Sequence, residues 1–463
     1  MENRITILQK PSILLILFSV CFSIWFVDLW KPWHRQSIND NPFVWDVAQY
    51  YSYLPATFIY DYGFTYNEDQ MTFLNEAPLG GKMPKTTYGM SILYSPFFAL
   101  GYKIALNQHN PITGYSEPFS TCVHFGSMFY GLLGLFLLRN FLIKFYSEKV
   151  TAITLAIIFF GTNLFCYVLS ASEMTHGHLF MLFSALLLTT YHWYQNPTYF
   201  KSLLIGLIIG LSCLIRPTEI LVSFLFVFWM TGSLSELKVR MLFLFQSYKH
   251  LLLMAFIAFL FWIPQLLFWK LKTGTYLYFS YPGERFFWND PQIFNILFSY
   301  RKGWLVYSPL IVLGFLGFFF MKTETKKTRP FLIAFFVITI YMLSCWWDWG
   351  FGGSFGGRGF VQYYALLALP IAALTQYIFE INQHKIIQAI QKIFFFIVFS
   401  GICMNIGQTH QFNLGLIRYD SMSKKSYWTV FNKYNLSPAE NKTFWKSLKE
   451  PDYQKMRKGE RDN

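Results

Sequence analysis

Apolar and polar positions divide this chain into long alternating blocks. Apolar runs of roughly 18 to 25 residues recur along it, and a helix needs about this length to cross the hydrocarbon core of a bilayer. We therefore predict an all-α polytopic membrane protein with about 11 transmembrane helices. The predicted spans are residues 12–30, 119–142, 150–170, 178–194, 202–215, 218–232, 250–268, 304–321, 330–347, 361–380 and 388–407.

The number of spans depends on the apolar run from 202 to 232. The stretch "LIRPTEIL" interrupts this run at Arg216 and Pro217. Proline ends or kinks a helix, and an arginine inside lipid is costly, so we expect two short helices here. The stretch 88–106 is also apolar, but polar residues and a proline interrupt it. We expect it to form an amphipathic helix that lies in the membrane interface.

Basic residues set the predicted orientation. The first span follows Arg4 and Lys10, which places its start in the cytoplasm, and alternation of the later spans brings the other strongly basic loops to the same side. We expect a membrane domain over 1–407 and an extracytoplasmic tail over 408–463. Within the membrane domain, the predicted outer segments are the large first loop 31–118, the short turn 171–177, and the loops 269–303 and 344–360.

Composition supports the membrane assignment and narrows the partners. The 463 residues are 54% hydrophobic and only 13% charged, which is too little charge to cover a soluble surface. The formal net charge is +14, yet no soluble segment carries a basic stripe with interleaved aromatic residues. We therefore exclude nucleic acid and expect membrane lipids or a phosphorylated substrate as partners.

Cations on the predicted outer face need a separate explanation. A cluster of them around a cavity would suit a lipid-linked phosphate, because guanidinium groups bind phosphate through two parallel hydrogen bonds. The alternative is snorkelling to ordinary lipid headgroups. Arg216 and Arg358 lie beside predicted helix breaks, so we favour substrate binding for these two. The outer cations are Lys82, Lys85, Arg216, Lys270, Lys272, Arg285, Arg301, Lys302 and Arg358.

Acidic residues are also unexpected at this depth. Asp46 follows the first span in an aromatic setting, and Glu173 lies in the short outer turn near His176 and His178. A carboxylate at the outer rim could act as a general base, bind a divalent metal ion, or serve as a helix cap or structural ion pair. The two histidines do not have the helical spacing of an HExxH metal motif, so they are a weak metal site.

The loop "WWDWGFGGSFGGRG" (346–359) is rich in tryptophan and glycine. It is no dinucleotide fingerprint, because Phe355 stands where the third glycine belongs, and it lacks the G-K-[ST] of a P-loop. Its glycines allow backbone N–H groups to turn toward an anion. Trp346, Trp347 and Trp349 fit an interfacial belt, and indole faces such as that of Trp347 also stack on sugar rings.

Taken in order, these stretches resemble the GT-C superfamily of integral-membrane glycosyltransferases, which includes the protein O-mannosyltransferases and the lipid A aminoarabinose transferases. The resemblance covers the chain from the first span to about residue 407. It rests on the order of "WDVAQYYSYLPA", "KTTYGMSILYSPFF", "EMTHGH", "LIRPTE", "SYRKGWLVYSPL" and "WWDWGFGGSFGGRGFVQYYALLALP".

The resemblance implies an inverting transferase that moves a sugar from a polyprenyl-phosphate donor to a lipid, glycan or protein acceptor, in the bacterial inner (cytoplasmic) membrane with its active site facing outward. Asp46 maps to the catalytic acid of the first loop and Glu173 to a second acid. The donor phosphate would fall, by position, to Lys85, Arg301, Lys302 and Arg358. A divalent metal, with Asp46, Glu173 and His176 as candidate ligands, stays open. The family's usual pair of adjacent acids is missing here, since Trp45 precedes Asp46.

Two other functions compete with transfer. A transporter or flippase of a lipid-linked sugar would use the outer charges as a gate, but it should carry charges near mid-membrane and paired broken helices in two repeated halves. A non-enzymatic scaffold for envelope assembly would explain the aromatic tail and leave the outer Arg, Asp and Glu residues without a reason. We favour the enzyme because the unusual charges gather on one predicted face.

Overall fold

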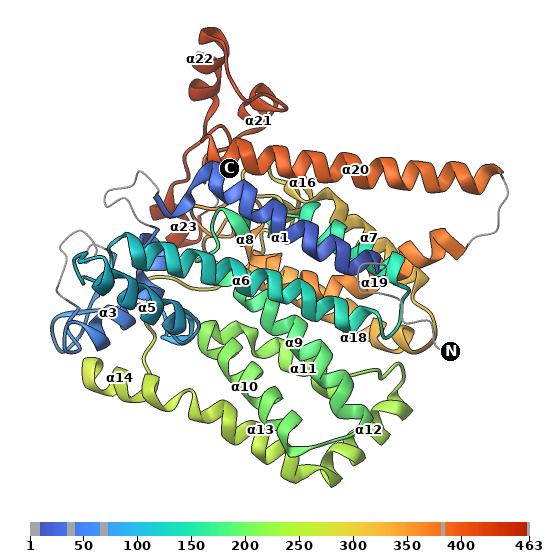
Figure 1. The fold of residues 1–463 in the computed structure, drawn as a ribbon, viewed down its shortest axis with the longest axis horizontal. Helices are drawn as coiled ribbons and strands as arrows, with labels where there is room; N and C mark the ends of the chain where they lie inside the picture. The colour runs from blue at the N-terminus through green and yellow to red at the C-terminus, as the bar shows by residue number, and fades with distance from the viewer. Residues whose placement is uncertain (1–9, 35–41, 65–72, 381–384, 461–463) are drawn as a thin grey trace.

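The computed structural model describes residues 10–34, 42–64, 73–380 and 385–460, and nearly all of its regular structure is helical (Figure 1). Within these ranges the one sheet is a two-stranded antiparallel pair, β1 (Asn75–Glu76) with β2 (Lys82–Met83), in the first outer loop. The all-α prediction is confirmed.

Six helical stretches are long and apolar enough to cross a membrane, so the coarse prediction of a helical membrane protein agrees with the structure. Three shorter apolar stretches, 199–215, 217–227 and 309–320, accompany them. The six are α1 (Pro11–Trp30), α6 (Glu117–Leu142), α13 with α14 (Tyr248–Leu260 and Ile263–Thr273), α18 (Thr323–Ser344), η6 with α19 (Arg358–Tyr363 and Tyr364–Glu380), and most of α20 (Lys385–Asn413).

Several predicted spans are interrupted helices. The predicted span 150–170 is two helices, and its break at Asn163 faces the break before Pro309 in the span 304–321. The backbone N–H of Asn163 donates to Ser308 Oγ at 3.0 Å, and Ser308 Oγ donates to Asn163 Oδ1 at 3.2 Å. Each break thus provides hydrogen-bond partners for polar groups of the other, because backbone groups inside a membrane have no water to bind. The pieces are α7 (Glu148–Phe160), α8 (Leu164–Leu169), α16 (Trp304–Tyr307), η4 (Pro309–Ile311), α17 (Val312–Gly317) and η5 (Phe318–Phe320).

The predicted break at Arg216 is present. Helix α10 (Tyr199–Ile215) ends directly before it, Arg216 itself is extended, and the chain continues as η3 (Pro217–Val222) and α11 (Ser223–Val227). The stretch 88–106 forms helix α5 (Gly89–Asn107), which packs closely against α6. Its helical state is confirmed, whereas its location in a membrane interface remains a prediction.

The other elements complete the two ends of the bundle. The first outer loop carries η2 (Pro32–His34), α2 (Trp45–Tyr51) and α3 (Tyr53–Phe58), and the remaining helices of the bundle are α9 (Thr175–Gln195), α12 (Leu234–Gln246) and α15 (Ile293–Phe298). Beyond α20, which runs past the predicted boundary at 407, the tail folds into α21 (Lys424–Val430), α22 (Pro438–Ser447) and α23 (Tyr453–Lys458). Helices α21 and α22 project from the bundle, and α23 returns to it (Figure 1).

The predicted outer segments meet at one end of the bundle, on the left in Figure 1, and the predicted inner loops meet at the other. Contacts that join outer segments are Asp46–Arg358, Lys85–Glu284, Tyr94–Glu173, Arg285–Trp347 and Ser354–Tyr419. At the other end, Lys327–Glu236 and Lys322–Glu380 join inner loops, and Arg139 donates to Ser12 at the start of α1. The loops are therefore grouped at two ends, while the number of crossings between these ends remains a prediction. Which end faces the cytoplasm remains a prediction, and Arg4, on which it partly rests, lies outside the described residues.

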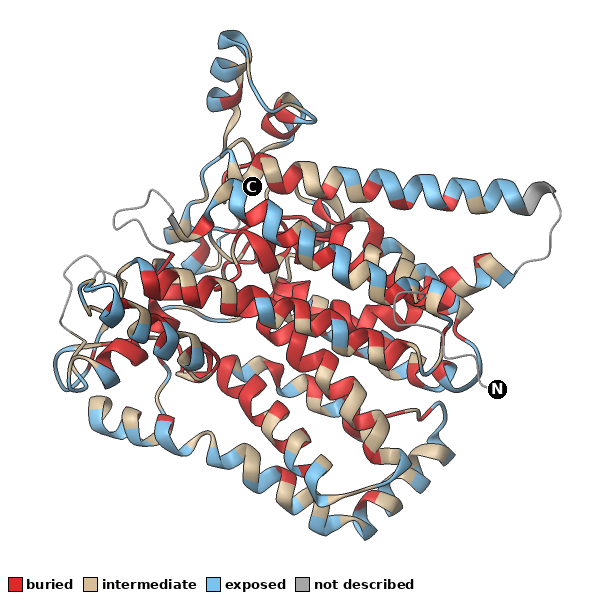
Figure 2. Ribbon diagram, in the orientation of Figure 1, coloured by how far each residue is buried: buried red, intermediate tan, exposed pale blue. Residues whose placement is uncertain are grey.

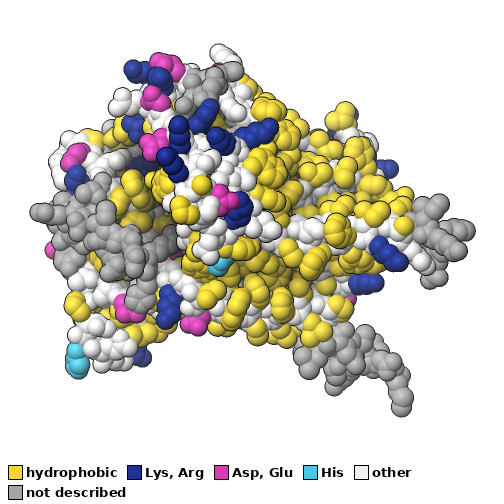
Figure 3. Space-filling model, turned by 90° about the horizontal axis from the view of Figure 1, so that it is seen from above, with side chains coloured by type: hydrophobic (Ala, Val, Ile, Leu, Met, Phe, Trp, Pro, Cys, Tyr) yellow, Lys and Arg dark blue, Asp and Glu magenta, His cyan; other side chains and the backbone are white. Residues whose placement is uncertain are grey.

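Burial separates a packed interior from an apolar exterior. Buried residues fill the centre of the bundle, around α6, α9 and α19, while α13, α14 and α20 are largely exposed (Figure 2). The exposed side chains of these outer helices are mostly apolar, for example Leu252, Phe256, Phe396 and Phe399. Seen from above, apolar side chains cover the broad surface to the right of the charge-rich left end (Figure 3). Such a surface is suited to lipid and not to water.

Candidate functional site

An ion pair between Asp46 and Arg358 lies at the centre of the outer end. Asp46 is in the first turn of α2, and Arg358 begins η6 directly after the glycine-rich loop. Arg358 Nη2 donates to Asp46 Oδ2 at 2.9 Å, across 312 positions of sequence. The Asp46 side chain is 30% exposed and that of Arg358 is 12% exposed. The carboxylate is therefore reachable, while the guanidinium is largely shielded.

Two further cations lie close to this pair. Burial alone would raise the pKa of Asp46, but the positive charges of Arg358, Lys85 and Arg216 hold it below its ordinary value. Arg216 interacts with the hydroxyl of Tyr50, one turn along α2 from Asp46. The site therefore combines an ionised carboxylate with cations from the first outer loop, the "LIRPTE" break and the glycine-rich loop. We call Asp46, Lys85, Arg216 and Arg358 the Asp46 cluster.

Arg358 has hydrogen-bonding capacity to spare. A guanidinium carries five N–H donors, and within the described ranges its side chain makes a single hydrogen bond, to Asp46. Its Nε is buried and has no partner among the described residues. A buried donor without a partner is costly, so this group is suited to an acceptor that arrives with a ligand.

A layer of buried polar side chains supports the cluster from below. Gln362 Nε2 donates to Glu219 Oε1 at 3.0 Å, and Tyr363 Oη donates to Glu219 Oε2 at 2.9 Å. His176 Nδ1 lies 3.2 Å from Gln362 Oε1. This layer ties η3 and α9 to η6, and so fixes the position of Arg358. Sequence analysis missed Glu219; its signal was its place three residues after Arg216 in the same helix break.

The glycine-rich loop is organised from within. Asp348 accepts hydrogen bonds from the backbone N–H groups of Gly350 at 3.1 Å and Gly352 at 2.6 Å. Lys302, only 1% exposed, donates to the backbone oxygen and hydroxyl of Ser354 at 2.6 and 2.7 Å, and to the backbone oxygen of Tyr419 in the tail. Burial lowers the pKa of Lys302 well below its ordinary value. Two glycine N–H groups expected to face an anion, and one cation expected to bind phosphate, thus hold the loop together.

Of the other predicted phosphate and sugar ligands, Trp347 is linked to the cluster, whereas Arg301 contacts the glycine-rich loop. Trp347 Nε1 donates to Glu284 Oε2 at 3.1 Å, and Glu284 Oε1 lies 3.3 Å from Lys85 Nζ, so Trp347 is linked to the cluster through one carboxylate. The guanidinium of Arg301 stacks on the ring of Trp349, 5.6 Å from its centroid.

Glu173 lies deeper in the bundle. It is 2% exposed, its Oε1 is 2.6 Å from His124 Nδ1, and its backbone oxygen accepts a hydrogen bond from Tyr94. The three candidate metal ligands therefore have different partners: Arg358 for Asp46, His124 for Glu173 and Gln362 for His176. Among the described residues, no three His, Cys, Asp or Glu side chains are placed to hold a metal ion together. These residues therefore do not fit a divalent metal site.

No protein-family model matches the chain, and no curated protein matches it either.

Proposed function

We propose that this chain is a membrane glycosyltransferase. It moves a sugar from a polyprenyl-phosphate donor to an envelope lipid, glycan or protein acceptor on the extracytoplasmic face of the bacterial cytoplasmic membrane. The observation that carries the proposal is the Asp46 cluster: a partly exposed carboxylate surrounded by Lys85, Arg216 and Arg358, at one end of an apolar helical bundle. The resemblance to the GT-C superfamily supports the same function.

About 11 crossings complete this proposal. The six long apolar stretches would be joined by α7 with α8, α9, α10, η3 with α11, and the run from α16 to η5. An odd number of crossings leaves the N-terminus and the tail on opposite sides. The large first loop, the glycine-rich loop and the tail then share the outer face, where a polyprenyl phosphate in the outer leaflet has its headgroup.

The donor phosphate binds to the cations. Arg358 keeps donors that Asp46 does not use, and charge-assisted hydrogen bonds from guanidinium to phosphate are among the strongest in proteins. Arg216 and Lys85 add positive charge from two other segments. A phosphate held by three segments is also oriented, which a single surface lysine cannot achieve.

Asp46 activates the acceptor. Its carboxylate takes the proton of the acceptor hydroxyl, the acceptor oxygen forms a bond to C1 of the sugar, and the bond from C1 to the phosphate oxygen breaks with inversion. The electron pair of that bond leaves with the polyprenyl phosphate, and Arg358 stabilises the charge that develops there. As Arg358 turns its hydrogen bonds toward the phosphate, its hold on Asp46 weakens and the carboxylate becomes a better base. The pair therefore couples departure of the leaving group to removal of the proton.

The experiment uses the purified full chain in lipid nanodiscs, mixed with lipid-linked sugars and acceptor lipids extracted from cell membranes. Transfer releases polyprenyl phosphate without sugar, which mass spectrometry detects. We expect release with the natural chain and with Glu76→Gln, an exposed acid of the same outer loop, and none with Asp46→Asn. Movement of an intact lipid-linked sugar across liposomes containing the chain, without cleavage, would instead establish the flippase.

A further inference from the structure

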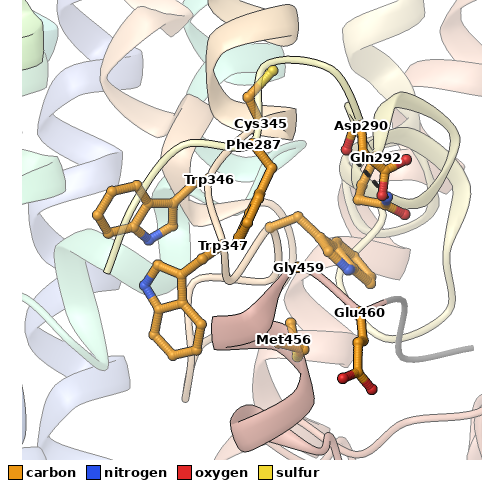
Figure 4. Close-up of a pocket in the computed structure, with 10 residues that line it drawn as sticks. Phe287, Asp290, Gln292, Cys345, Trp346, Trp347, Met456, Gly459 and Glu460 are labelled. Carbon is orange, nitrogen blue, oxygen red and sulfur yellow. Dashed lines mark hydrogen bonds between the residues drawn. The ribbon is translucent and has the colours of Figure 1, made fainter. Parts of the chain in front are cut away.

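We infer that the cavity between the tryptophans of the glycine-rich loop and the end of the tail is a carbohydrate subsite, which holds a neutral or amino sugar ring of the glycosyl substrate (Figure 4). This inference rests on the proposed function and names the substrate chemistry beside the Asp46 cluster. The cavity contains about 350 Å³ of empty space, part of which is open to solvent.

Three segments that are distant in sequence build the walls. The loop before α15 contributes Phe287, Asp290 and Gln292; the loop after α18 contributes Cys345, Trp346, Trp347 and Trp349; and the tail contributes Met456, Gly459 and Glu460. In Figure 4 the indoles of Trp346 and Trp347 lie on one side, and Asp290, Gln292 and Glu460 lie on the other. The end of the tail therefore forms one wall of the cavity.

The two loop walls are held in register by backbone hydrogen bonds. Phe287 N donates to Cys345 O at 2.6 Å, Trp347 N donates to Arg285 O at 3.1 Å, and the backbones of Phe286 and Trp346 form an antiparallel bridge. Guanidinium groups stack on three of the rings and hold their orientation. These are Arg285 on Phe287 at 4.7 Å, Arg457 on Trp347 at 5.1 Å and Arg301 on Trp349 at 5.6 Å. A wall fixed in this way loses little entropy when a ligand binds.

The lining chemistry matches a sugar ring. Aromatic faces pack against the apolar C–H faces of sugars, while carboxylate and amide groups hydrogen-bond to hydroxyls at the ring edge. Gln292 Nε2 donates to Asp290 Oδ2 at 3.2 Å, so one such polar edge is already arranged. Among the described residues, the formally charged side chains that line the cavity are Asp290 and Glu460, while Arg285, Arg301 and Arg457 contact its rings without lining it. The negative charges of Asp290 and Glu460 favour a neutral or amino sugar over a sugar acid.

One residue joins this subsite to the phosphate site. Trp347 lines the cavity, and its Nε1 donates to Glu284, which pairs with Lys85 of the Asp46 cluster. A glycosyl substrate with its phosphate on the cations can therefore place a sugar ring against the indoles. The cationic cluster and the acidic, aromatic cavity are complementary to the two chemically different parts of one lipid-linked sugar.

The experiment measures sugar binding apart from transfer. Saturation-transfer difference NMR is recorded on the full chain in nanodiscs free of glycosidic detergent, with the methyl glycosides of glucose, glucosamine and glucuronic acid as probes. We expect the first two to bind and the glucuronide to bind more weakly. Trp346→Ala and Glu460→Gln should each weaken binding about five- to tenfold, the size expected from losing one stacking or hydrogen-bonding partner.

Controls separate this inference from the proposed function. Trp445→Ala removes an indole of the tail that is 54% exposed and does not line the cavity, and it should leave sugar binding unchanged. Glu460→Gln changes an exposed side chain, so it reports on the cavity even if Trp346→Ala fails to fold. Equal binding of the glucuronide, or unchanged binding in both cavity variants, would overturn the inference. Sugar binding without any transfer would instead overturn the proposed function and leave the subsite standing.

Discussion

Two arginines, at opposite ends of the bundle, show how the same residue serves structure in one place and a ligand in another. Arg139 lies at the end of the predicted inner loops. Its Nε donates to Ser12 Oγ at 2.8 Å, its Nη1 donates to Asn140 Oδ1 at 3.0 Å, and its Nη2 pairs with Glu148. Arg358, at the other end, hydrogen-bonds through Nη2 to Asp46, and its buried Nε has no partner in the described part of the chain.

The two arginines differ in how many of their hydrogen-bond donors have partners within the protein. A buried guanidinium whose three nitrogens all have protein partners holds its neighbours in place and has little left for a ligand. A guanidinium with a buried donor left over stays costly until an acceptor arrives. By the same measure Lys302, with three oxygen partners, and Glu173, paired with His124, have partners within the protein and keep less capacity for a ligand than Arg358.

The most severe test of this comparison is Asp46→Asn. The amide cannot take a proton, so we expect sugar transfer to fall about 10²- to 10⁴-fold, the usual size of a general-base effect. The variant should accumulate as the natural chain does and melt only slightly lower, because it loses one partly exposed ion pair while its amide still accepts a hydrogen bond from Arg358. Transfer assays per milligram of purified protein check this. Full activity would remove Asp46 from the mechanism.

Arg358→Lys tests the unused donors of the outer arginine. An ammonium keeps the charge but loses the planar fork, so use of the polyprenyl-phosphate donor should fall about 10- to 100-fold, as expected for loss of hydrogen bonds to a charged group. Lys82→Ala is the matched control, since Lys82 is an outer cation paired with the exposed Glu76. Equal loss in both variants would mean that general charge, and not the geometry of Arg358, attracts the donor.

Arg139→Met tests the saturated arginine. Its removal leaves Ser12 and Glu148 without their partner, and we expect a loss of about 1–3 kcal/mol of stability. That is less than the roughly 3–5 kcal/mol for a fully buried pair, because Glu148 is 31% exposed. A lower melting temperature in detergent, with unchanged transfer per folded molecule, checks this. A loss of transfer without a loss of stability would contradict the structural role.

The smallest expected effect is in the pH dependence of stability. The cations of the Asp46 cluster outweigh the effect of burial and keep the pKa of Asp46 below its ordinary value. The ion pair between Asp46 and Arg358 should therefore stabilise the fold at neutral pH and lose this contribution only as the pH falls through that lowered pKa. Arg358→Gln removes the nearest cation and should move this loss to higher pH. Melting temperatures of the natural chain and of Arg358→Gln, recorded between about pH 7 and pH 3, test this, because the ordinary pKa of aspartate is about 3.9. An unchanged profile would show that Arg358 does not set the state of Asp46.

Sequence patterns predicted the helical membrane architecture, the break at Arg216 and the presence of Asp46 and Arg358 at the same end of the bundle. These follow from apolar length, proline and the cost of isolated charge, which act on short stretches. The sequence did not reveal that the breaks at Asn163 and Pro309 face each other, or that Glu219 supports η6. A charge or a helix break shows that a partner is needed, but the partner is chosen by packing between distant segments. For that reason Lys302 was assigned to the donor phosphate and Glu173 to catalysis, whereas their side chains have partners within the protein.

The most direct test of the central claim is a single-turnover measurement with the purified chain in nanodiscs. Lipid-linked sugars carrying a radiolabel are bound first, acceptor lipids are added, and labelled product is counted against labelled donor that stays bound. We predict that the natural chain converts its bound donor, while Asp46→Asn retains bound donor and forms no product. Product formation by Asp46→Asn at the natural rate, or no difference in donor binding between the natural chain and Arg358→Lys, would contradict the account.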